Sequence, residues 1–138
     1  DNFDLENSHV LPALIRKFHE AKQSGIETVE LWGSGAPKRE FLHADDLAQA
    51  SLSLLKNYDG DIALNVGSGE DISISDLAQL IAEVVGFTGK VEWDKTKPDG
   101  TPRKLLDVSR MRSLGWTARV ELQDGIRNTY SHFLQSIS

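Results

Sequence analysis

Cysteine is absent from this sequence of 138 residues. A disulfide framework, a thiolate zinc site and a cysteine nucleophile are therefore excluded within it. Its four histidines never stand four residues apart, the spacing that places two imidazoles on one helix face, so we expect no metal site. No apolar run approaches the ~20 residues that a membrane-spanning helix requires. No signal-peptide pattern opens the sequence, and we expect no membrane partner.

Positive charge is scarce as well. Lys and Arg total 15 against 21 Asp and Glu, which gives a net charge of -6 and makes a nucleic-acid partner a poor expectation. Apolar residues make up 39% and charged residues 26%, as in ordinary globular domains. The length suits one domain over residues 1–138. The sequence starts with Asp1 and reads like the middle of a longer protein, and the lack of cysteine fits a reducing, cytoplasmic location.

Hydrophobic periodicity predicts a mixed α/β fold of about four helices with three or four short strands. Apolar residues at spacings of three and four predict helices over residues 8–24, 45–56, 73–85, 107–113 and 123–135. Alternating, β-rich stretches predict strands over residues 28–32, 39–43, 62–66 and 90–94. Ser8 and Asp45 are expected as N-caps, and Ser73 with Asp76 forms an S-x-x-D capping box. Two prolines and a glycine exclude a regular element from residues 95–104.

Two Gly-Ser-Gly turns, at residues 33–35 and 67–69, are the only glycine pairs that suggest chemistry. Neither forms the G-x-S-x-G motif of a serine hydrolase. Residues 62–94 resemble part of a dinucleotide-binding βαβ unit, but Ile72 stands where the third glycine belongs and the helix begins only after Ser73. We therefore expect turns at both places and no dinucleotide site within this sequence.

Basic residues gather in three clusters and predict a site for phosphate, because Arg and Lys side chains in loops can converge on an anion. Trp32, before a glycine-rich turn, can offer a flat face to a base or sugar ring. His9 stands at the start of the first helix, and histidine side chains change protonation close to neutral pH, which suits general acid–base catalysis. Solvated surface charges, a core Trp32 and a surface His9 remain the alternatives. The clustered basic residues are Arg16, Lys17, Lys38, Arg39, Lys95, Lys97, Arg103 and Lys104.

Two stretches, W-G-S-G-x-P-x-R-E-F-L-H-x-D-D-L-A and K-P-D-G-T-P-R-K-L-L-D-V-S-R, resemble the GDP-L-fucose synthase family. These enzymes belong to the extended short-chain dehydrogenase/reductases. The family's glycine-rich Rossmann turn, its active-site cysteine and its Tyr-x-x-x-Lys motif are missing, since neither Tyr58 nor Tyr130 is followed four residues later by lysine. The resemblance therefore implies the C-terminal, substrate-binding portion of such an enzyme, lacking the Rossmann domain.

The resemblance also implies an activity. The family epimerises GDP-4-keto-6-deoxy-D-mannose at C3 and C5 and reduces C4 with NADPH to give GDP-L-fucose. NADPH would be bound mainly by the missing N-terminal domain, the whole enzyme would be a homodimer, and this portion alone would be inactive. The catalytic acid of the epimerisation, placed near the nicotinamide, corresponds to His9. The residues that correspond to contacts with the GDP-sugar are Lys17, Trp32, Arg39, Asp99 and Lys104.

Two other functions remain open at this point. The general layout also suits the substrate domain of another nucleotide-sugar epimerase or dehydratase. A non-enzymatic interaction module is the second alternative. For Asp45, Asp46, Asp107 and Arg110, which also match the family pattern, we expect structural roles as caps and in local ion pairs.

Overall fold

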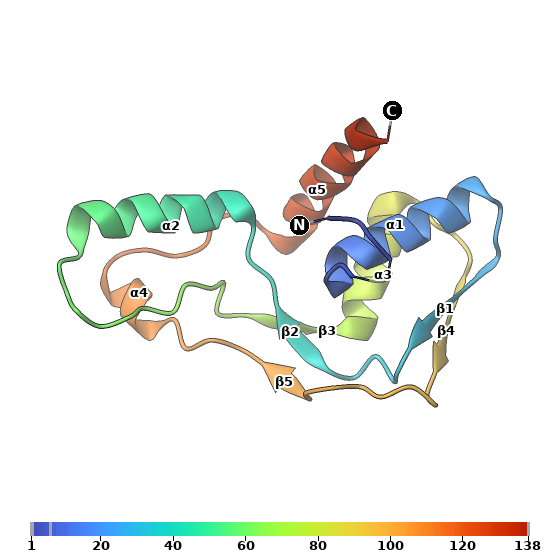
Figure 1. The fold of residues 1–138 in the computed structure, drawn as a ribbon, viewed down its shortest axis with the longest axis horizontal. Coiled ribbons are helices and arrows are strands. Elements are labelled where there is room, and N and C mark those ends of the chain that lie inside the picture. The colour runs from blue at the N-terminus through green and yellow to red at the C-terminus, as the bar shows by residue number, and fades with distance from the viewer. Residues whose placement is uncertain (1, 6, 138) are drawn as a thin grey trace.

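The fold is mixed α/β, as the sequence predicts, and was obtained as a computed structural model that describes residues 2–5 and 7–137 (Figure 1). Its helices are α1 (Val10–Gln23), α2 (Ala44–Asn57), α3 (Ile74–Val85), α4 (Ser109–Ser113) and α5 (Leu122–Ser136). Its strands are β1 (Thr28–Trp32), β2 (Lys38–Glu40), β3 (Asp71–Ser73), β4 (Lys90–Asp94) and β5 (Arg103–Lys104). Each helix overlaps a predicted range, whereas β3 and β5 were not expected, and β5 lies within residues 95–104, from which the sequence excluded a regular element. None of these helices is both long and apolar enough to cross a lipid bilayer.

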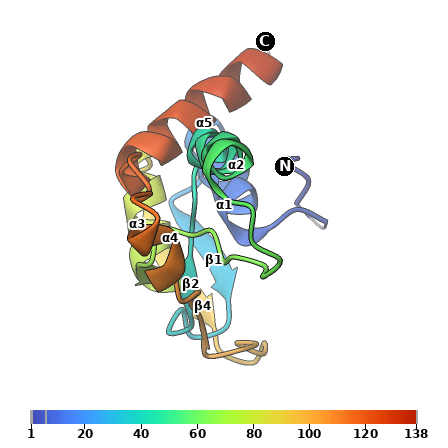
Figure 2. The same ribbon diagram turned by 90° about the vertical axis from the view of Figure 1, so that its left-hand side faces the viewer.

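The strands form two small sheets. Strands β1 and β4 pair in parallel, with Trp32 opposite Asp94 at their ends. Strand β2 is the centre of the second sheet, antiparallel to β3 and parallel to β5. Both ribbon views place β1, β2 and β4 on one side of helices α1 and α5 (Figures 1 and 2). The turn after β1 therefore brings the two sheets together at one end of the molecule.

The hydrophobic core lies where α1, α3 and α5 meet the β1–β4 pair. Ile15, Ile81 and Ile126 contribute one fully buried side chain from each helix. Phe18 of α1 packs against Phe87, which follows α3, with ring centroids 5.3 Å apart. Burial of side chains of this size stabilises a fold by about 1.5–3 kcal/mol each, so these three helices form the rigid support for the loops beside the sheets.

Helix boundaries agree with the sequence at α3 and differ at two N-caps. The Ser73 hydroxyl accepts a hydrogen bond from the Asp76 amide at 3.0 Å, which confirms the capping box, and α3 ends at Gly86 with φ of 75°. The N-cap of α1 is His9, whereas the Ser8 hydroxyl donates to the Asp4 carbonyl. The N-cap of α2 is His43, and Asp45 lies in the first turn. Ser8 and Asp45 are therefore wrong as N-cap predictions, because the N-cap lies two residues earlier in α2 and one residue later in α1.

The strand predicted over residues 62–66 is wrong. These residues join no sheet in the described chain, and β2 pairs instead with β3 and β5. β3 and β5 are three and two residues long, too short to show an alternating pattern. They exist because β2 offers hydrogen-bonding edges on both sides, which is a tertiary condition that local sequence does not contain.

Candidate functional site

Trp32 stands at the mouth of a cavity beside the β1–β4 pair. As the last residue of β1 it is 71% exposed, so the alternative that it is a core residue is wrong. Its indole and the Lys17 side chain line one cavity of about 320 Å³. The other lining residues are mostly apolar: Leu5, Val10, Ala13, Leu14, Leu31, Ile74 and Trp93. A hollow with an apolar wall, an exposed indole and one cation suits a ligand that combines a ring with negative charge.

Helix α1 places two of the predicted residues along this cavity. Lys17 reaches across to β1, where its Nζ donates to the Glu30 carbonyl at 2.6 Å. His9 is the exposed N-cap of the same helix and directly precedes Val10, which lines the cavity. His9 and Lys17 are eight residues apart, a rise of about 12 Å along the helix axis. Lys17 therefore lines the cavity, and His9 lies outside its lining, next to Val10.

Arg39 and Lys104 are brought together by the second sheet, although 65 positions separate them in the sequence. They face each other in the parallel register of β2 and β5. Neighbouring strands lie about 4.8 Å apart, and paired residues project from the same face of the sheet. The Arg39 guanidinium is engaged at 2.7 Å by the neighbouring Lys38 carbonyl. The sheet thus presents two cationic side chains side by side.

Asp99 fastens the loop of residues 95–102 to the glycine-rich turn after β1. One of its carboxylate oxygens accepts from the Ser34 amide at 2.6 Å, and the other accepts from the Ser34 hydroxyl at 2.7 Å. These hydrogen bonds favour the ionised form and hold the pKa of Asp99 below its usual value. A Cβ at Gly33, where φ is 84°, would lie 2.5 Å from the same carboxylate. The turn therefore requires glycine at that position.

The same loop connects the indole to the cationic pair. The Lys97 Nζ lies 5.5 Å from the centroid of the Trp32 ring, a cation–π distance. At the other end, a Cβ on Gly100 would stand 3.9 Å from the Arg39 guanidinium. The predicted residues thus fall into a chain of neighbours: Lys17 and Trp32 share a cavity, Asp99 holds the loop beside Trp32, and that loop reaches Arg39.

Sequence reasoning missed three contributors to this arrangement. The sequence predicts Ser34 only as part of a turn, and in the structure it is the partner that orients Asp99. Trp93 of β4 lines the cavity and underlies Gly35, where a Cβ would meet the indole at 2.7 Å. Lys97 was noted only as one of several clustered cations. Trp93 could have been found from the sequence, because the two predicted five-residue strands each contain a tryptophan near their end.

The second glycine turn does not fit a dinucleotide. The Gly69 amide, which would face a pyrophosphate in a glycine-rich loop, donates to the Glu40 carboxylate at 2.7 Å. A Cβ at Gly67 would also collide with that carboxylate. A fixed negative charge at this position opposes anion binding, and the described residues 62–66, which lead into the turn, form no strand. Within the part of the chain that the structure describes, no group of three or more His, Asp or Glu side chains gathers as a metal site would require.

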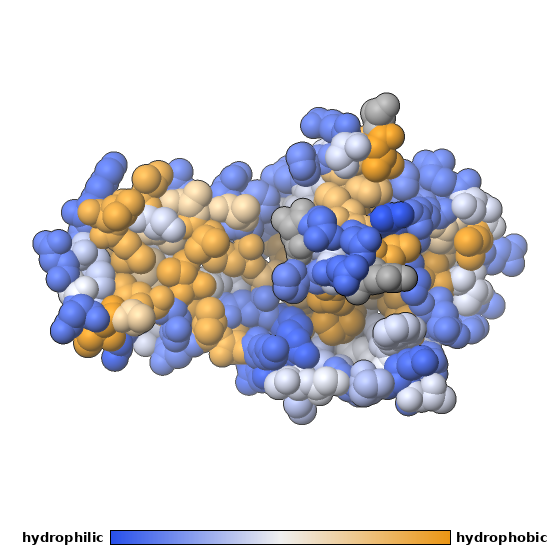
Figure 3. Space-filling view, in the orientation of Figure 1, coloured by the Kyte–Doolittle hydropathy of each residue, from blue (hydrophilic) through white to orange (hydrophobic). Residues whose placement is uncertain are grey.

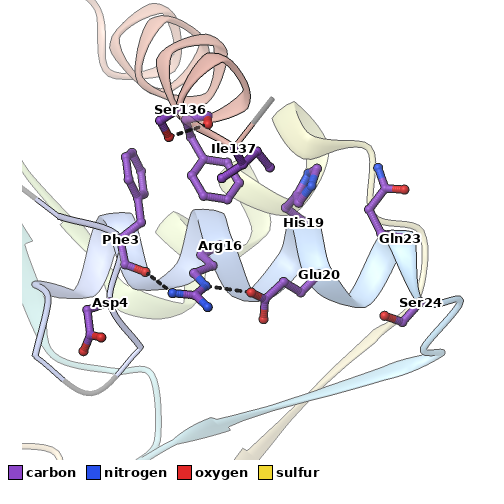
Figure 4. A pocket seen from close by; sticks show the side chains of 10 residues that line it. Phe3, Asp4, Arg16, His19, Glu20, Gln23, Ser24, Ser136 and Ile137 are labelled. Carbon is purple, nitrogen blue, oxygen red and sulfur yellow. Dashed lines mark hydrogen bonds and ion pairs between the residues drawn. The ribbon is translucent and has the colours of Figure 1, made fainter.

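A second cavity, of about 570 Å³, lies on another side of α1, between this helix and the end of α5 (Figure 4). The Arg16 guanidinium bridges the Phe3 carbonyl at 3.2 Å and the Glu20 carboxylate at 2.6 Å on its floor. His19 is buried at its edge, where its Nδ1 lies 3.0 Å from the Tyr130 hydroxyl. Of the clustered basic residues only Arg16 lines this cavity, and none of the residues matched to catalysis or to GDP-sugar contacts does, so it is separate from the candidate site.

Comparisons with known proteins agree with the resemblance. Residues 1–67 match the NAD dependent epimerase/dehydratase family. The chain is 58% identical over 137 residues to GDP-L-fucose synthase 1 of Arabidopsis thaliana and covers 42% of it. It is 50% identical over 145 residues to GDP-L-fucose synthase of Escherichia coli (strain K12) and covers 45% of it. Each match includes 99% of this chain.

A solved structure extends the agreement to the fold. The GDP-L-fucose synthetase from Naegleria fowleri bound to NADP superposes with a TM-score of 0.92 at 32% identity, over 99% of this chain and 43% of that one. The chain thus spans less than half the length of the relatives it matches. The resemblance seen in the two sequence stretches is confirmed: along nearly its whole length this chain is similar to the matched portions of GDP-L-fucose synthases, and its first 67 residues match the NAD dependent epimerase/dehydratase family.

Proposed function

We propose that this chain forms the GDP-sugar-binding wall of a GDP-L-fucose synthase. The whole enzyme would epimerise GDP-4-keto-6-deoxy-D-mannose at C3 and C5 and reduce C4 with NADPH. The observation that carries the proposal is the 58% identity to a GDP-L-fucose synthase over nearly the whole chain. The neighbourhood of an exposed indole and cationic side chains, in a chain whose net charge is -6, supports a nucleotide diphosphate as the ligand.

Each predicted residue has a role that its surroundings allow. Lys17 and Arg39 now contact neutral carbonyl oxygens, and a diphosphate would offer both of them stronger, charge-assisted hydrogen bonds. Lys104 adds charge beside Arg39. Trp32 would pack against a ring of the ligand. Asp99 would act mainly by fixing the loop, because Ser34 occupies both of its oxygens.

His9 is proposed as the acid of the epimerisation. The keto group at C4 acidifies the protons at C3 and C5, and an acid must return each proton to the opposite face of the sugar. An exposed imidazole at the edge of the cavity can carry that proton. The glycine turn of this chain does not fit NADPH, so we assign the cofactor mainly to the part of the enzyme that this chain does not include. The isolated chain is therefore expected to be inactive.

The test uses a hybrid enzyme, in which this chain replaces its matched portion of the Arabidopsis relative. Arg39→Ala should weaken GDP-sugar binding by about 10–100-fold, because a charge-assisted hydrogen bond contributes about 1.5–3 kcal/mol. Lys90→Ala, an exposed cation at the start of β4, is the matched control and should leave affinity unchanged. Calorimetric titration with the GDP-sugar measures the affinity of both variants. Unchanged affinity in Arg39→Ala would favour an interaction module, and a preference for UDP-sugars would favour another nucleotide-sugar enzyme.

Homodimer formation by the whole enzyme and a cytoplasmic location complete the proposal. Sedimentation of the hybrid tests the first, and fractionation of cells that express it tests the second. Turnover of the keto sugar by the isolated 138-residue chain would contradict the proposed division of the enzyme.

A further inference from the structure

Glu40 holds three segments of the chain with a single carboxylate. It is half-buried at the end of β2. Its Oε1 accepts from the Gly69 amide at 2.7 Å, and its Oε2 accepts from the Leu106 amide at 2.9 Å. The Ser68 hydroxyl also donates to Oε1, at 3.4 Å. This one side chain therefore fastens β2, the centre of the second sheet, both to the turn that leads into β3 and to the residues that follow β5.

The carboxylate and the cationic pair of this sheet lie on opposite faces. Successive residues of a strand point to opposite faces, so Glu40 faces away from Arg39. Lys104 is paired with Arg39 in the parallel register and therefore shares its face. A ligand held by Arg39 and Lys104 thus does not touch Glu40, which can position the two cations only through the backbone of β2 and β5.

Lys104 depends on Glu40 because β5 is only two residues long. A strand of this length makes few ladder hydrogen bonds, and short ladders with few buried contacts open readily. The amide of Leu106, two residues after Lys104, donates to Glu40, so this side chain fastens the chain where the ladder with β2 ends. Without Glu40, Lys104 would lose its fixed distance from Arg39.

The face that carries Glu40 holds a second link between the outer strands. Arg103 of β5 donates through Nε to the carboxylate of Asp71 in β3, across the central strand. Because the Arg103 side chain is 61% exposed, water screens this ion pair, and it contributes less than the two hydrogen bonds of Glu40. Space-filling representation agrees, since the surface over β2 and β5 is hydrophilic (Figure 3). Glu40 is therefore the main tether of β5.

We propose that Glu40 is a positioning residue for the GDP-sugar: it fixes the spacing of Arg39 and Lys104, so that both cations reach the same diphosphate. The inference rests on the proposed function, because it takes these two cations as contacts of the diphosphate. Charge-assisted hydrogen bonds are short and directional, so two cations on one diphosphate need a fixed spacing. A carboxylate is required at position 40, because the two amides approach different oxygens and a glutamine side chain offers only one acceptor oxygen.

Glu40→Gln separates this role from a simple charge effect, because the two predict changes of opposite sign. Removing a negative charge near Arg39 and Lys104 would by itself raise the affinity for a diphosphate. Loss of one tether instead lowers that affinity, since the glutamine NH2 group cannot accept from the second backbone amide. In the hybrid enzyme we expect GDP-sugar binding to weaken about tenfold in Glu40→Gln and about 30-fold in Glu40→Ala, which loses both tethers.

Calorimetric titration measures these affinities, and steady-state kinetics should show a raised KM with a nearly unchanged kcat, because Glu40 contacts no reacting atom. Glu27→Gln is the matched control: it removes the same charge from an exposed residue before β1 and should leave the affinity and KM unchanged. Thermal unfolding establishes that each variant is folded at the temperature of the titration. If Glu40→Ala is not folded there, the milder Glu40→Gln decides.

A double-mutant cycle shows whether Glu40 acts through the cationic pair. If it does, Glu40→Gln should weaken binding by a smaller factor in the Arg39→Ala background than in the parent hybrid. The proposal is overturned if Glu40→Gln leaves the affinity unchanged or raises it, if its effect is equal in both backgrounds, or if kcat falls while KM stays constant. An unchanged affinity in Arg39→Ala would overturn the proposed function itself, whereas a loss in Arg39→Ala with normal binding in Glu40→Gln would overturn only the positioning role.

Discussion

The carboxylate of Asp46 is the main polar tether of α2, and its removal provides the sharpest test of how this helix is held. Asp46 is 5% exposed. One of its oxygens accepts from two consecutive amides, Arg119 at 3.0 Å and Val120 at 2.9 Å. These amides precede α5, so the carboxylate connects α2 to the segment that leads into a core helix. Asp46→Ala removes both hydrogen bonds at once.

The expected loss follows from these contacts. A hydrogen bond to a charged group contributes about 1.5–3 kcal/mol. Arg119 is exposed, so water can satisfy its amide after the substitution, and we expect a total loss of about 2 kcal/mol. For a chain of this size this corresponds to a decrease in Tm of about 6 °C. Asp46→Asn keeps an acceptor oxygen and loses only the charge, and it should cost about half as much.

Thermal unfolding followed by circular dichroism gives the Tm values, and hydrogen exchange reports the two amides directly. Both amides should exchange faster in Asp46→Ala, whereas amides of α1 should change only with global stability. A Tm within 1–2 °C of the parent, or unchanged exchange at residues 119 and 120, would refute the role of Asp46 as a tether.

Three further outcomes follow from the core and the loops. Phe18→Ala should lower the free energy of unfolding by about 4 kcal/mol in urea denaturation, since the ring is fully buried. Hydrogen bonds from Ser34 lower the pKa of Asp99 below the value of 3.8 expected in the unfolded chain. The stabilisation by the ionised carboxylate is therefore present above pH 3.8 and is lost as the pH falls through the lower pKa of the folded state. NMR titration of the Asp99 carboxyl should give a midpoint below 3.8, and a midpoint at or above 3.8 would contradict this role of Asp99. Gly35→Ala should lower the Tm and shift the fluorescence of Trp93, because φ is 75° and the new Cβ would meet that indole.

Local sequence was sufficient to predict an element where the pattern of that element lies within a single segment. Residues 28–32 and 90–94 form strands with the predicted bounds, and the capping box at Ser73 opens α3 where expected. The pairing of Arg39 with Lys104 was not predictable in the same way. It depends on β5, a two-residue strand that exists only because β2 lies beside it. The partner of Asp99 was equally hidden, because Ser34 is 65 residues away and lies in a turn that glycine dominates.

The failed strand at residues 62–66 has a different cause from the missed short strands. A strand pattern states which backbone conformation the residues favour, but a strand also needs an edge to pair with, and that edge can lie outside the sequence under study. Helix α2 carries the same message, since its periodicity was correct and its apolar face is exposed. The helical period of α2 was therefore predictable from its own residues, whereas the partner of its apolar face and the pairing of residues 62–66 depend on tertiary contacts that local sequence does not contain.

The position of the proposed sugar site relative to helix α2 limits how the two can influence each other. The site depends on the turn of residues 33–35, the loop of residues 95–102 and the β2–β5 pair, and all of these rest on the core of α1, α3 and α5. Helix α2 follows β2 directly, three residues after Glu40. The Glu40 carboxylate, in turn, accepts from the amides of Gly69 and Leu106, which flank the segments leading to β3 and from β5. A change in the position of α2 would therefore reach Arg39 and Lys104 through Glu40, and would leave Trp32 and Lys17 in place.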